Sequence, residues 1–201
     1  MVDLYIYTFY DETGYWIVED NKLIFEKSMK ERQISKNFYS LFAESGIKFS
    51  EIGRISFING PGSFTSLRFF LTFAKALKVS FSEVEVIPLN LLEVMGFQKG
   101  ETVDVVMGGN REFLKFFHHA RYENKDGIFK IVKDVDLISY EDAKKLKKPL
   151  FLGVKPEFEV TPYKISLLDM IKYTDYKIKN SDFDDIITLT PYYYKKFSTK
   201  K

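Results

Sequence analysis

The chain has 201 residues, of which 45% are apolar and 29% are charged, and its formal net charge is +2. This balance is typical of a globular protein, and the charge is too small to indicate a nucleic-acid binder. Because there is no cysteine, disulfides and thiolate sites are excluded. The N-terminus lacks the pattern of a signal peptide and no apolar run is long enough to span a bilayer, so we expect a cytoplasmic protein with no membrane partner.

The first 28 residues show the pattern of three strands separated by turns. The predicted strands are residues 2–9, 15–18 and 23–25, with turns at 11–14 and 19–22. Connections this short indicate antiparallel hairpins. A helix follows, because Ile34, Phe38, Leu41 and Phe42 recur on one face, and Gly46 is its predicted end.

The next elements alternate between strand and helix. We predict a strand at 55–58, a helix at 67–78, a strand at 84–87, a helix at 88–95 and a strand at 102–107. The order β-β-β-α-β-α-β is that of half of a ribonuclease H-like fold, which actin-like ATPase domains share. The predicted fold class is therefore α/β, with two lobes of this type and a reduced second lobe.

The C-terminal half carries weaker signals. We predict a hairpin from 112–121 and 127–132, a short helix at 139–146, a strand at 150–153 and a helix at 161–173. Ser139 is the expected cap of the short helix. The predicted domains are residues 1–100, an actin-like lobe, and 101–201, the reduced second lobe.

The most informative segment is 59–68, which reads Asn-Gly-Pro-Gly-Ser-Phe-Thr-Ser-Leu-Arg and joins a strand to a helix. One interpretation is structural, since Gly60 and Gly62 permit unusual backbone angles, Pro61 stiffens the turn and Ser63 caps the helix. The other is an anion cradle at a helix N-terminus. No Gly-Lys-Ser/Thr ending is present and Arg68 is the nearest base, so the structural interpretation is favoured.

The helix after this junction is apolar on two sides. One face holds Leu67, Phe70, Leu71, Ala74 and Leu77. The second face, roughly 125° away, holds Phe69, Phe73 and Ala76. The second face is either buried within the chain's own fold or meets another protein.

The chain offers few candidates for metal or catalytic chemistry. His118 and His119 are the only histidines and have no acid at ligand spacing, so no metal site is predicted and one ring is expected inward and one outward. The acids Asp182, Asp184 and Asp185 are interpreted as a solvated loop.

Two further features bear on ligands. Actin-like ATPases hold metal and phosphate with an aspartate near the end of the first strand, where this chain has Tyr7-Thr8-Phe9. The tail combines tyrosines 192–194 with lysines 195, 196, 200 and 201, a mixture that can touch RNA. The alternative, a final strand and a solvated end, is favoured for the tail.

Residues 59–68, followed by Ala-Lys-Ala-Leu at 74–77, resemble the Gly-Pro-Gly-Ser-Phe-Thr-Gly-Leu-Arg…Ala-Lys-Gly-Leu signature of the TsaB (YeaZ) family. The helical segment 31–46 lies at the family's usual distance before that signature. Residues 139–141 resemble the family's Ser-Pro-Glu, and 191–195 resemble its closing Pro-x-Tyr-x-Arg.

The resemblance implies a non-catalytic subunit for making threonylcarbamoyladenosine in tRNA, without a cofactor. Such a subunit pairs with the catalytic TsaD, works with TsaE and TsaC, forms homodimers when alone, and meets tRNA only through the complex. The two helices around the signature would make the contacts. The partner-binding residues implied are Phe38, Phe42, Gly60, Pro61, Gly62, Ser63, Phe64, Thr65, Arg68, Phe69, Thr72, Phe73 and Ala76.

The chain also departs from the family pattern. Tyr7-Thr8-Phe9 replaces an Asp-Thr-Ser, residues 107–110 replace an Asp-Ala-Arg, and Ser66 replaces a glycine. The first two changes remove acids that would hold a metal-bound nucleotide, which favours a scaffold role. A nucleotide-binding ATPase or phosphotransferase on the same fold, or weak ATPase activity, remains the alternative, and a stand-alone RNA binder is a third.

Overall fold

The computed structural model describes residues 1–9, 12–30, 34–97, 102–108, 116–125, 128–154, 156–182 and 185–192. The chain divides into two units, and each unit is made of two stretches that are separate in sequence. The first unit is Met1–Leu89 with Met170–Pro191, and the second is Asn90–Asp169 with Tyr192–Lys201. The lobes expected from the sequence, 1–100 and 101–201, are each a single stretch.

The first unit is built on a five-stranded sheet of order β3-β2-β1-β4-β5. Its strands are β1 (Val2–Phe9), β2 (Glu12–Glu19), β3 (Lys22–Lys30), β4 (Ile52–Gly60) and β5 (Glu85–Asn90). The first three strands form antiparallel pairs, and β4 runs parallel to β1. A two-residue turn at Asp20 and Asn21, both with positive φ, joins β2 to β3, as the right-handed twist of a hairpin requires.

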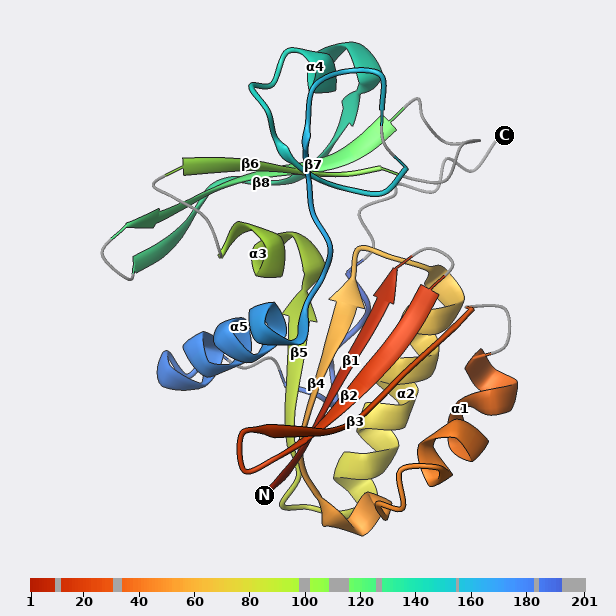
Figure 1. The fold of residues 1–201 in the computed structure, drawn as a ribbon. Helices are drawn as coiled ribbons and strands as arrows, with labels where there is room; N and C mark the ends of the chain where they lie inside the picture. Colours follow the sequence, from red (N-terminus) through yellow and green to blue (C-terminus); the bar gives the residue numbers. More distant parts are fainter. Residues whose placement is uncertain are drawn as a thin grey trace, which may run out of the picture. The chain divides into compact units, whose positions relative to one another are not determined.

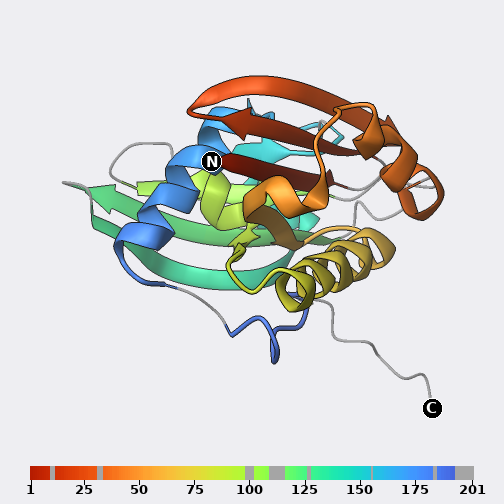
Figure 2. The same ribbon diagram turned by 90° about the horizontal axis from the view of Figure 1, so that it is seen from below.

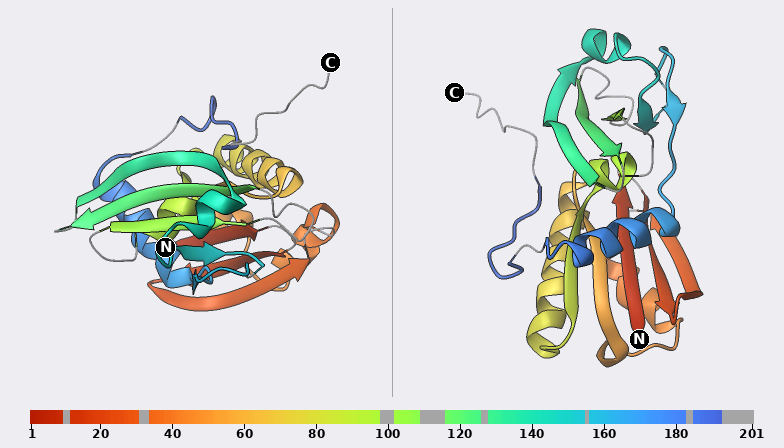
Figure 3. Two further views of the ribbon diagram at one scale, coloured as in Figure 1. Left: turned by 90° about the horizontal axis from the view of Figure 1, so that it is seen from above. Right: turned by 90° about the vertical axis from the view of Figure 1, so that its left-hand side faces the viewer.

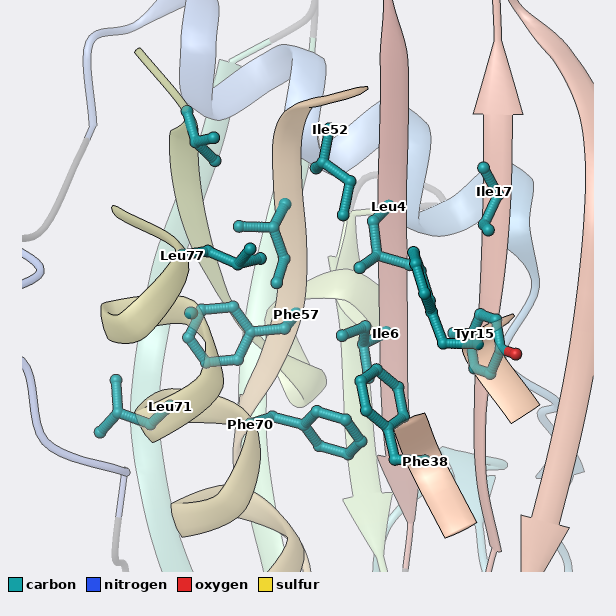
Figure 4. Packing of buried hydrophobic residues seen from close by; sticks show 14 of the residues in the cluster. Leu4, Ile6, Tyr15, Ile17, Phe38, Ile52, Phe57, Phe70, Leu71 and Leu77 are labelled. Carbon is teal, nitrogen blue, oxygen red and sulfur yellow. The ribbon is translucent and has the colours of Figure 1, made fainter. Parts of the chain in front are cut away.

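Helices cover both faces of this sheet. α1 (Ile34–Ala43) and α2 (Phe64–Ser80) lie on one face (Figure 1), and α5 (Leu167–Lys179) crosses the other (Figure 3). A 3₁₀ turn, η2 (Phe49–Glu51), leads into β4. The core between the sheet and α1 and α2 is aliphatic and aromatic. Figure 4 shows side chains from α1, α2 and three strands converging there: Phe38, Phe70, Leu71, Leu77, Leu4, Ile6, Tyr15 and Phe57.

The second unit repeats the strand order. Its elements are α3 (Leu91–Gly96), β6 (Thr102–Met107), β7 (Phe116–Lys125), β8 (Ile128–Ser139), α4 (Tyr140–Lys144), β9 (Leu150–Leu152) and β10 (Thr161–Pro162). The sheet order is β10-β9-β6-β7-β8, with β6, β7 and β8 antiparallel and β9 and β10 parallel to β6. Both units therefore have the topology expected of a ribonuclease H-like fold, and the predicted fold class is confirmed.

Several predicted boundaries are wrong for identifiable reasons. Glu12, Thr13 and Gly14 belong to β2 and not to a turn, because each pairs with a residue of β1. Pro88 lies in β5 and does not start a helix; α3 begins only after Asn90, whose side chain accepts the Leu92 N–H at 3.0 Å. Residues 161–162 form β10, and the helix predicted from 161 begins at 167.

Candidate partner-binding surface

The glycine junction is a tight connection between β4 and α2. The Gly60–Pro61 peptide bond is cis, and Gly60 has a φ of 134°, an angle that side-chain-bearing residues rarely adopt. A Cβ on Gly62 would lie 3.4 Å from the carbonyl oxygen of Thr8 and 3.6 Å from Leu67 Cδ2. The junction is therefore packed against the end of β1, as the structural interpretation of these glycines expects.

The predicted capping role of Ser63 is only half right. Ser63 occupies the N-cap position with extended backbone angles, and its carbonyl oxygen accepts the Leu67 N–H at 2.9 Å. Its hydroxyl, however, makes no capping hydrogen bond. The preceding Asn59 is fully buried and donates from Nδ2 to the Thr190 carbonyl oxygen at 2.9 Å. The junction is thus held by backbone geometry and by a distant part of the chain.

The first apolar face of α2 faces the core as predicted. Leu67, Phe70, Leu71, Ala74 and Leu77 are all buried against the sheet. Ser66, which stands where the resembling family has glycine, is buried with them and its hydroxyl has no hydrogen-bond partner among the described residues. This face fixes the helix on the sheet and therefore fixes which side of α2 points outward.

The second apolar face is largely internal. Phe69 and Phe73 are half-buried and meet the ring of Phe38 on α1, with ring centroids 5.7 Å and 5.0 Å apart. Phe73 also meets Phe49, 5.3 Å away. Phe38 and Phe42 themselves are 2% exposed. The sequence left open whether this face is buried within the fold or meets another protein. Phe69 and Phe73 pack within the fold, and of the three residues only Ala76 is exposed.

A third side of α2 faces outward, and we call it the α2 stripe. It comprises Phe64, Thr65, Arg68, Thr72, Ala76 and Val79, all exposed. Phe64 is 45% exposed and Val79 is 86% exposed. The Arg68 guanidinium carbon lies 4.6 Å from the centre of the Phe64 ring, a cation–π arrangement. Val79 was not among the predicted contacts.

α1 contributes one further exposed ring, which contacts the 3₁₀ turn η2. Tyr39 is 73% exposed, and its ring centroid lies 6.0 Å from that of Phe49. Large exposed apolar side chains mark interaction sites when they gather on one face. Thus five of the predicted contacts, Phe64, Thr65, Arg68, Thr72 and Ala76, share an exposed face, whereas Phe38 and Phe42 serve the core.

The end of β1, where actin-like ATPases place an aspartate, is occupied by an aromatic ring. Tyr7 pairs with Gly14 across the strands, and a Cβ on Gly14 would lie 2.4 Å from the Tyr7 ring. The ring stacks on Trp16 at 4.6 Å, and its hydroxyl donates to Glu12 Oε1 at 2.7 Å. Burial raises the pKa of the Tyr7 phenol, and the bond to Glu12 raises it further. Tyr7 therefore stays neutral and remains a donor.

In the second unit, His119 has an acidic partner, Asp104, that the spacing of residues in the sequence did not predict. Its Nε2 lies 2.7 Å from Asp104 Oδ1 on the neighbouring strand, and Arg121 donates two hydrogen bonds of 2.9 Å to the same carboxylate. Burial opposes ionisation of Asp104, but the bonds from His119 and Arg121 outweigh it and lower its pKa to about 2. His119 is buried and His118 half-buried. The cluster is a cross-strand ion pair, and no group of three candidate metal ligands occurs within the described ranges.

The remaining predicted features have mixed positions. Asp182 lies 3.4 Å from Lys177 Nζ, and Asp185 hydrogen-bonds its own loop, so these two acids are structural. Asp184, residues 109–110 and the tail from Tyr193 to Lys201 lie outside the described residues. Among the helices that the structure describes, none combines the length and apolarity needed to cross a bilayer.

Comparison with known proteins identifies the family. A family model described as TsaD, tRNA N6-adenosine threonylcarbamoyltransferase, matches residues 29–191. The chain belongs to this family. The TsaB protein of Buchnera aphidicola (subspecies Acyrthosiphon pisum, strain APS), described as a tRNA threonylcarbamoyladenosine biosynthesis protein, is 26% identical over 92 residues, or 44% of this chain. That match spans 41% of the Buchnera protein. The resemblance to TsaB predicted from residues 59–68 is confirmed.

Two solved structures from Pseudomonas aeruginosa share the fold. YeaZ matches with a TM-score of 0.69 and 12% identity, covering 96% of this chain and 99% of the YeaZ chain. A protein described as similar to the peptidase YeaZ matches with a TM-score of 0.67 and 13% identity, with the same coverage. Identity this low establishes the fold alone. The shared fold extends over nearly the full length of this chain.

Proposed function

We propose that this chain is a non-catalytic, TsaB-like subunit that pairs with TsaD in the synthesis of threonylcarbamoyladenosine on tRNA. The family match over residues 29–191 and the TsaB relative support the pathway. The observation that carries the pairing is the α2 stripe. Its outward side chains are apolar, cationic or hydroxyl-bearing and none is acidic, although the helix already buries one complete face in the core. A helix that needs no further burial for folding but exposes Phe64 and Val79 is suited to bind another protein.

The scaffold role is supported by the filled end of β1. In an actin-like ATPase this position would present an acid to a metal-bound phosphate, but here the Tyr7 ring covers Gly14 and bonds to Glu12. A neutral phenol with a raised pKa does not supply the negative charge that a divalent cation needs. The chain's contribution is therefore to hold and orient TsaD, and TsaD supplies the catalytic groups.

The same proposal defines the chain's other partners. TsaE and TsaC act on the assembled complex or upstream of it, and tRNA meets this chain only through the complex. In the absence of TsaD the chain forms a homodimer, and the complex works in the cytoplasm. No cofactor is required of this subunit, because its role depends on a surface.

The proposal is tested by mixing the chain with TsaD from the same organism and measuring the mass of the complex by size exclusion with light scattering. We expect a one-to-one or two-to-two complex. Thr72→Asp and Ala76→Asp place a carboxylate on the α2 stripe at exposed positions, so each should weaken binding at least tenfold and leave the melting temperature unchanged. Ile131→Asp on β8, where the side chain is 53% exposed, is the matched control and should bind normally.

Phe73→Asp is a less informative variant, because its carboxylate would lie against the rings of Phe38 and Phe49 and would disturb folding. If the wild-type chain forms no complex with TsaD, even with TsaE present, the pairing is refuted. In that case a calorimetric titration with Mg-ATP tests the ATPase alternative, which predicts saturable binding of one nucleotide.

A further inference from the structure

A segment near the C-terminus runs along α2 in the first unit, and we call residues 185–191 the strap. The Lys75 ammonium on α2 donates to the carbonyl oxygens of Ile187 and Leu189, both at 2.9 Å. Asn59, at the glycine junction, donates to the carbonyl oxygen of Thr190 at 2.9 Å. Figures 2 and 3 show this blue segment beside the yellow α2. Three hydrogen bonds from two elements therefore fix its backbone.

The strap has an ordered conformation of its own. The Asp185 carboxylate accepts hydrogen bonds from the Ile187 N–H at 3.0 Å and the Thr188 hydroxyl at 3.3 Å. The Asp185 carbonyl oxygen accepts the Leu189 N–H at 2.9 Å. Leu189 is 8% exposed and belongs to the core of the first unit. These turn hydrogen bonds and the buried Leu189 side chain hold the strap in one conformation along α2. We call the surface that the strap forms there the ridge.

The ridge borders the α2 stripe. Lys75 follows Thr72 by three residues and precedes Val79 by four, and residues at these spacings are neighbours on a helix surface. Its two carbonyl partners therefore lie beside the stripe. Ile187, which supplies one of these two carbonyls, is 80% exposed. Its side chain therefore adds exposed apolar area to a segment that Lys75 ties to α2.

The charges around this ridge indicate what it would bind. α2 contains Arg68, Lys75 and Lys78 and no acidic residue. The matching surface is therefore apolar at its centre and acidic at its edge. A second copy of this chain would set the cations of one α2 against those of the other, so self-association should be weaker than binding of a partner with acidic groups. The charge pattern favours a different protein over a second copy.

We propose that the strap forms one wall of the partner-binding surface, with Ile187 as an apolar contact and Lys75 as the residue that positions it. The inference rests on the proposed pairing with TsaD and assigns to that partner an apolar surface with acidic neighbours. If the strap takes part, partner binding depends on residues that lie more than a hundred positions after the glycine junction. The family signature itself lies in the junction and α2.

The test measures TsaD affinity by calorimetry for the wild-type chain, Ile187→Asp, Lys75→Met and Lys75→Arg, with Ile131→Asp as control. Ile187→Asp should weaken binding at least tenfold without changing the melting temperature, because the side chain is exposed. Lys75→Met removes both carbonyl contacts and should weaken binding several-fold. Lys75→Arg retains donors for both carbonyls and should restore affinity to within about twofold of the wild type, whereas methionine keeps an apolar stem of similar length but lacks the donors.

The outcomes separate the two proposals. Wild-type affinity for Ile187→Asp, with Thr72→Asp still impaired, overturns the strap and leaves the pairing intact. Absence of binding by the wild-type chain overturns both. If Ile187→Asp instead weakens only self-association, as measured by light scattering, the assignment of the strap to TsaD is wrong and the occupant is a second copy.

Discussion

Replacing Gly14 by alanine tests whether the Tyr7 ring really fills the end of β1. The backbone of Gly14 lies outside the left-handed region, so alanine is compatible with its conformation, but the new Cβ would lie 2.4 to 2.5 Å from two ring carbons and the hydroxyl oxygen of Tyr7. The ring must then move by about 1 Å, since ordinary contacts between such atoms begin near 3.5 Å. Movement of this size disrupts the ring's hydrogen bond and its stacking.

The energy follows from those two contacts. A hydrogen bond to a charged group contributes about 1.5–3 kcal/mol, and a ring pair about 0.5–1.5 kcal/mol. Because Glu12 is exposed, we take the lower ends, or about 2 kcal/mol in total. Alanine returns about 0.4–1 kcal/mol by restricting the unfolded chain. Gly14→Ala should therefore lower the free energy of unfolding by about 1–2 kcal/mol.

The decisive measurement is the same substitution in a Tyr7→Ala background. With no ring to displace, Gly14→Ala should stabilise the chain by about 0.4–1 kcal/mol, so its effect changes sign. Urea denaturation followed by fluorescence suits the assay, because Trp16 is the sole tryptophan and stacks on Tyr7. Equal destabilisation by Gly14→Ala in both backgrounds would refute the packing of Tyr7 on Gly14.

Three other predictions follow from contacts described above. Asp104→Asn should destabilise the chain by about 2 kcal/mol at pH 7, since the pKa of about 2 is depressed from 3.8 and the side chain is 15% exposed. That stabilisation is complete above the unfolded pKa and is lost as pH falls toward 2, so urea denaturation should show the two proteins converging below pH 4. Phe38→Ala should cost about 3–5 kcal/mol in the same denaturation assay, because the ring is 2% exposed. Ser139→Ala should cost about 1 kcal/mol in thermal unfolding because its hydroxyl accepts the Asp142 N–H, whereas Ser63→Ala should change stability by less than about 0.5 kcal/mol.

The sequence was sufficient wherever the signal is local. Strands 2–9 and 102–107 end where predicted, because β-branched and aromatic runs stop at turn residues. The core-facing side of α2 was also predicted correctly, since a 3.6-residue period identifies which side chains share a face. The glycine junction was located from three residues, as only glycine and proline produce so characteristic a turn.

Contacts between elements far apart in sequence were not predictable in this way. Periodicity shows that α2 is apolar on two sides, but it does not show that Phe38 and Phe49 would cover Phe73. The pairing of His119 with Asp104 depends on the register of two strands, and spacing along one strand carries no information on it. Lys75 reads as a solvated cation on a helix, because the carbonyl groups that it binds lie more than a hundred residues later.

Because the first unit combines residues from both ends of the sequence, its core can finish packing only after residues 170–191 have been synthesised. The core of the first unit includes Leu189, so that core lacks a side chain until residue 189 has left the ribosome. Residues 90–169, made later than the first sheet, are available to fold before the first sheet is finished. Contacts of such long sequence separation slow folding, so we expect the N-terminal sheet, although synthesised first, to reach its final packing last.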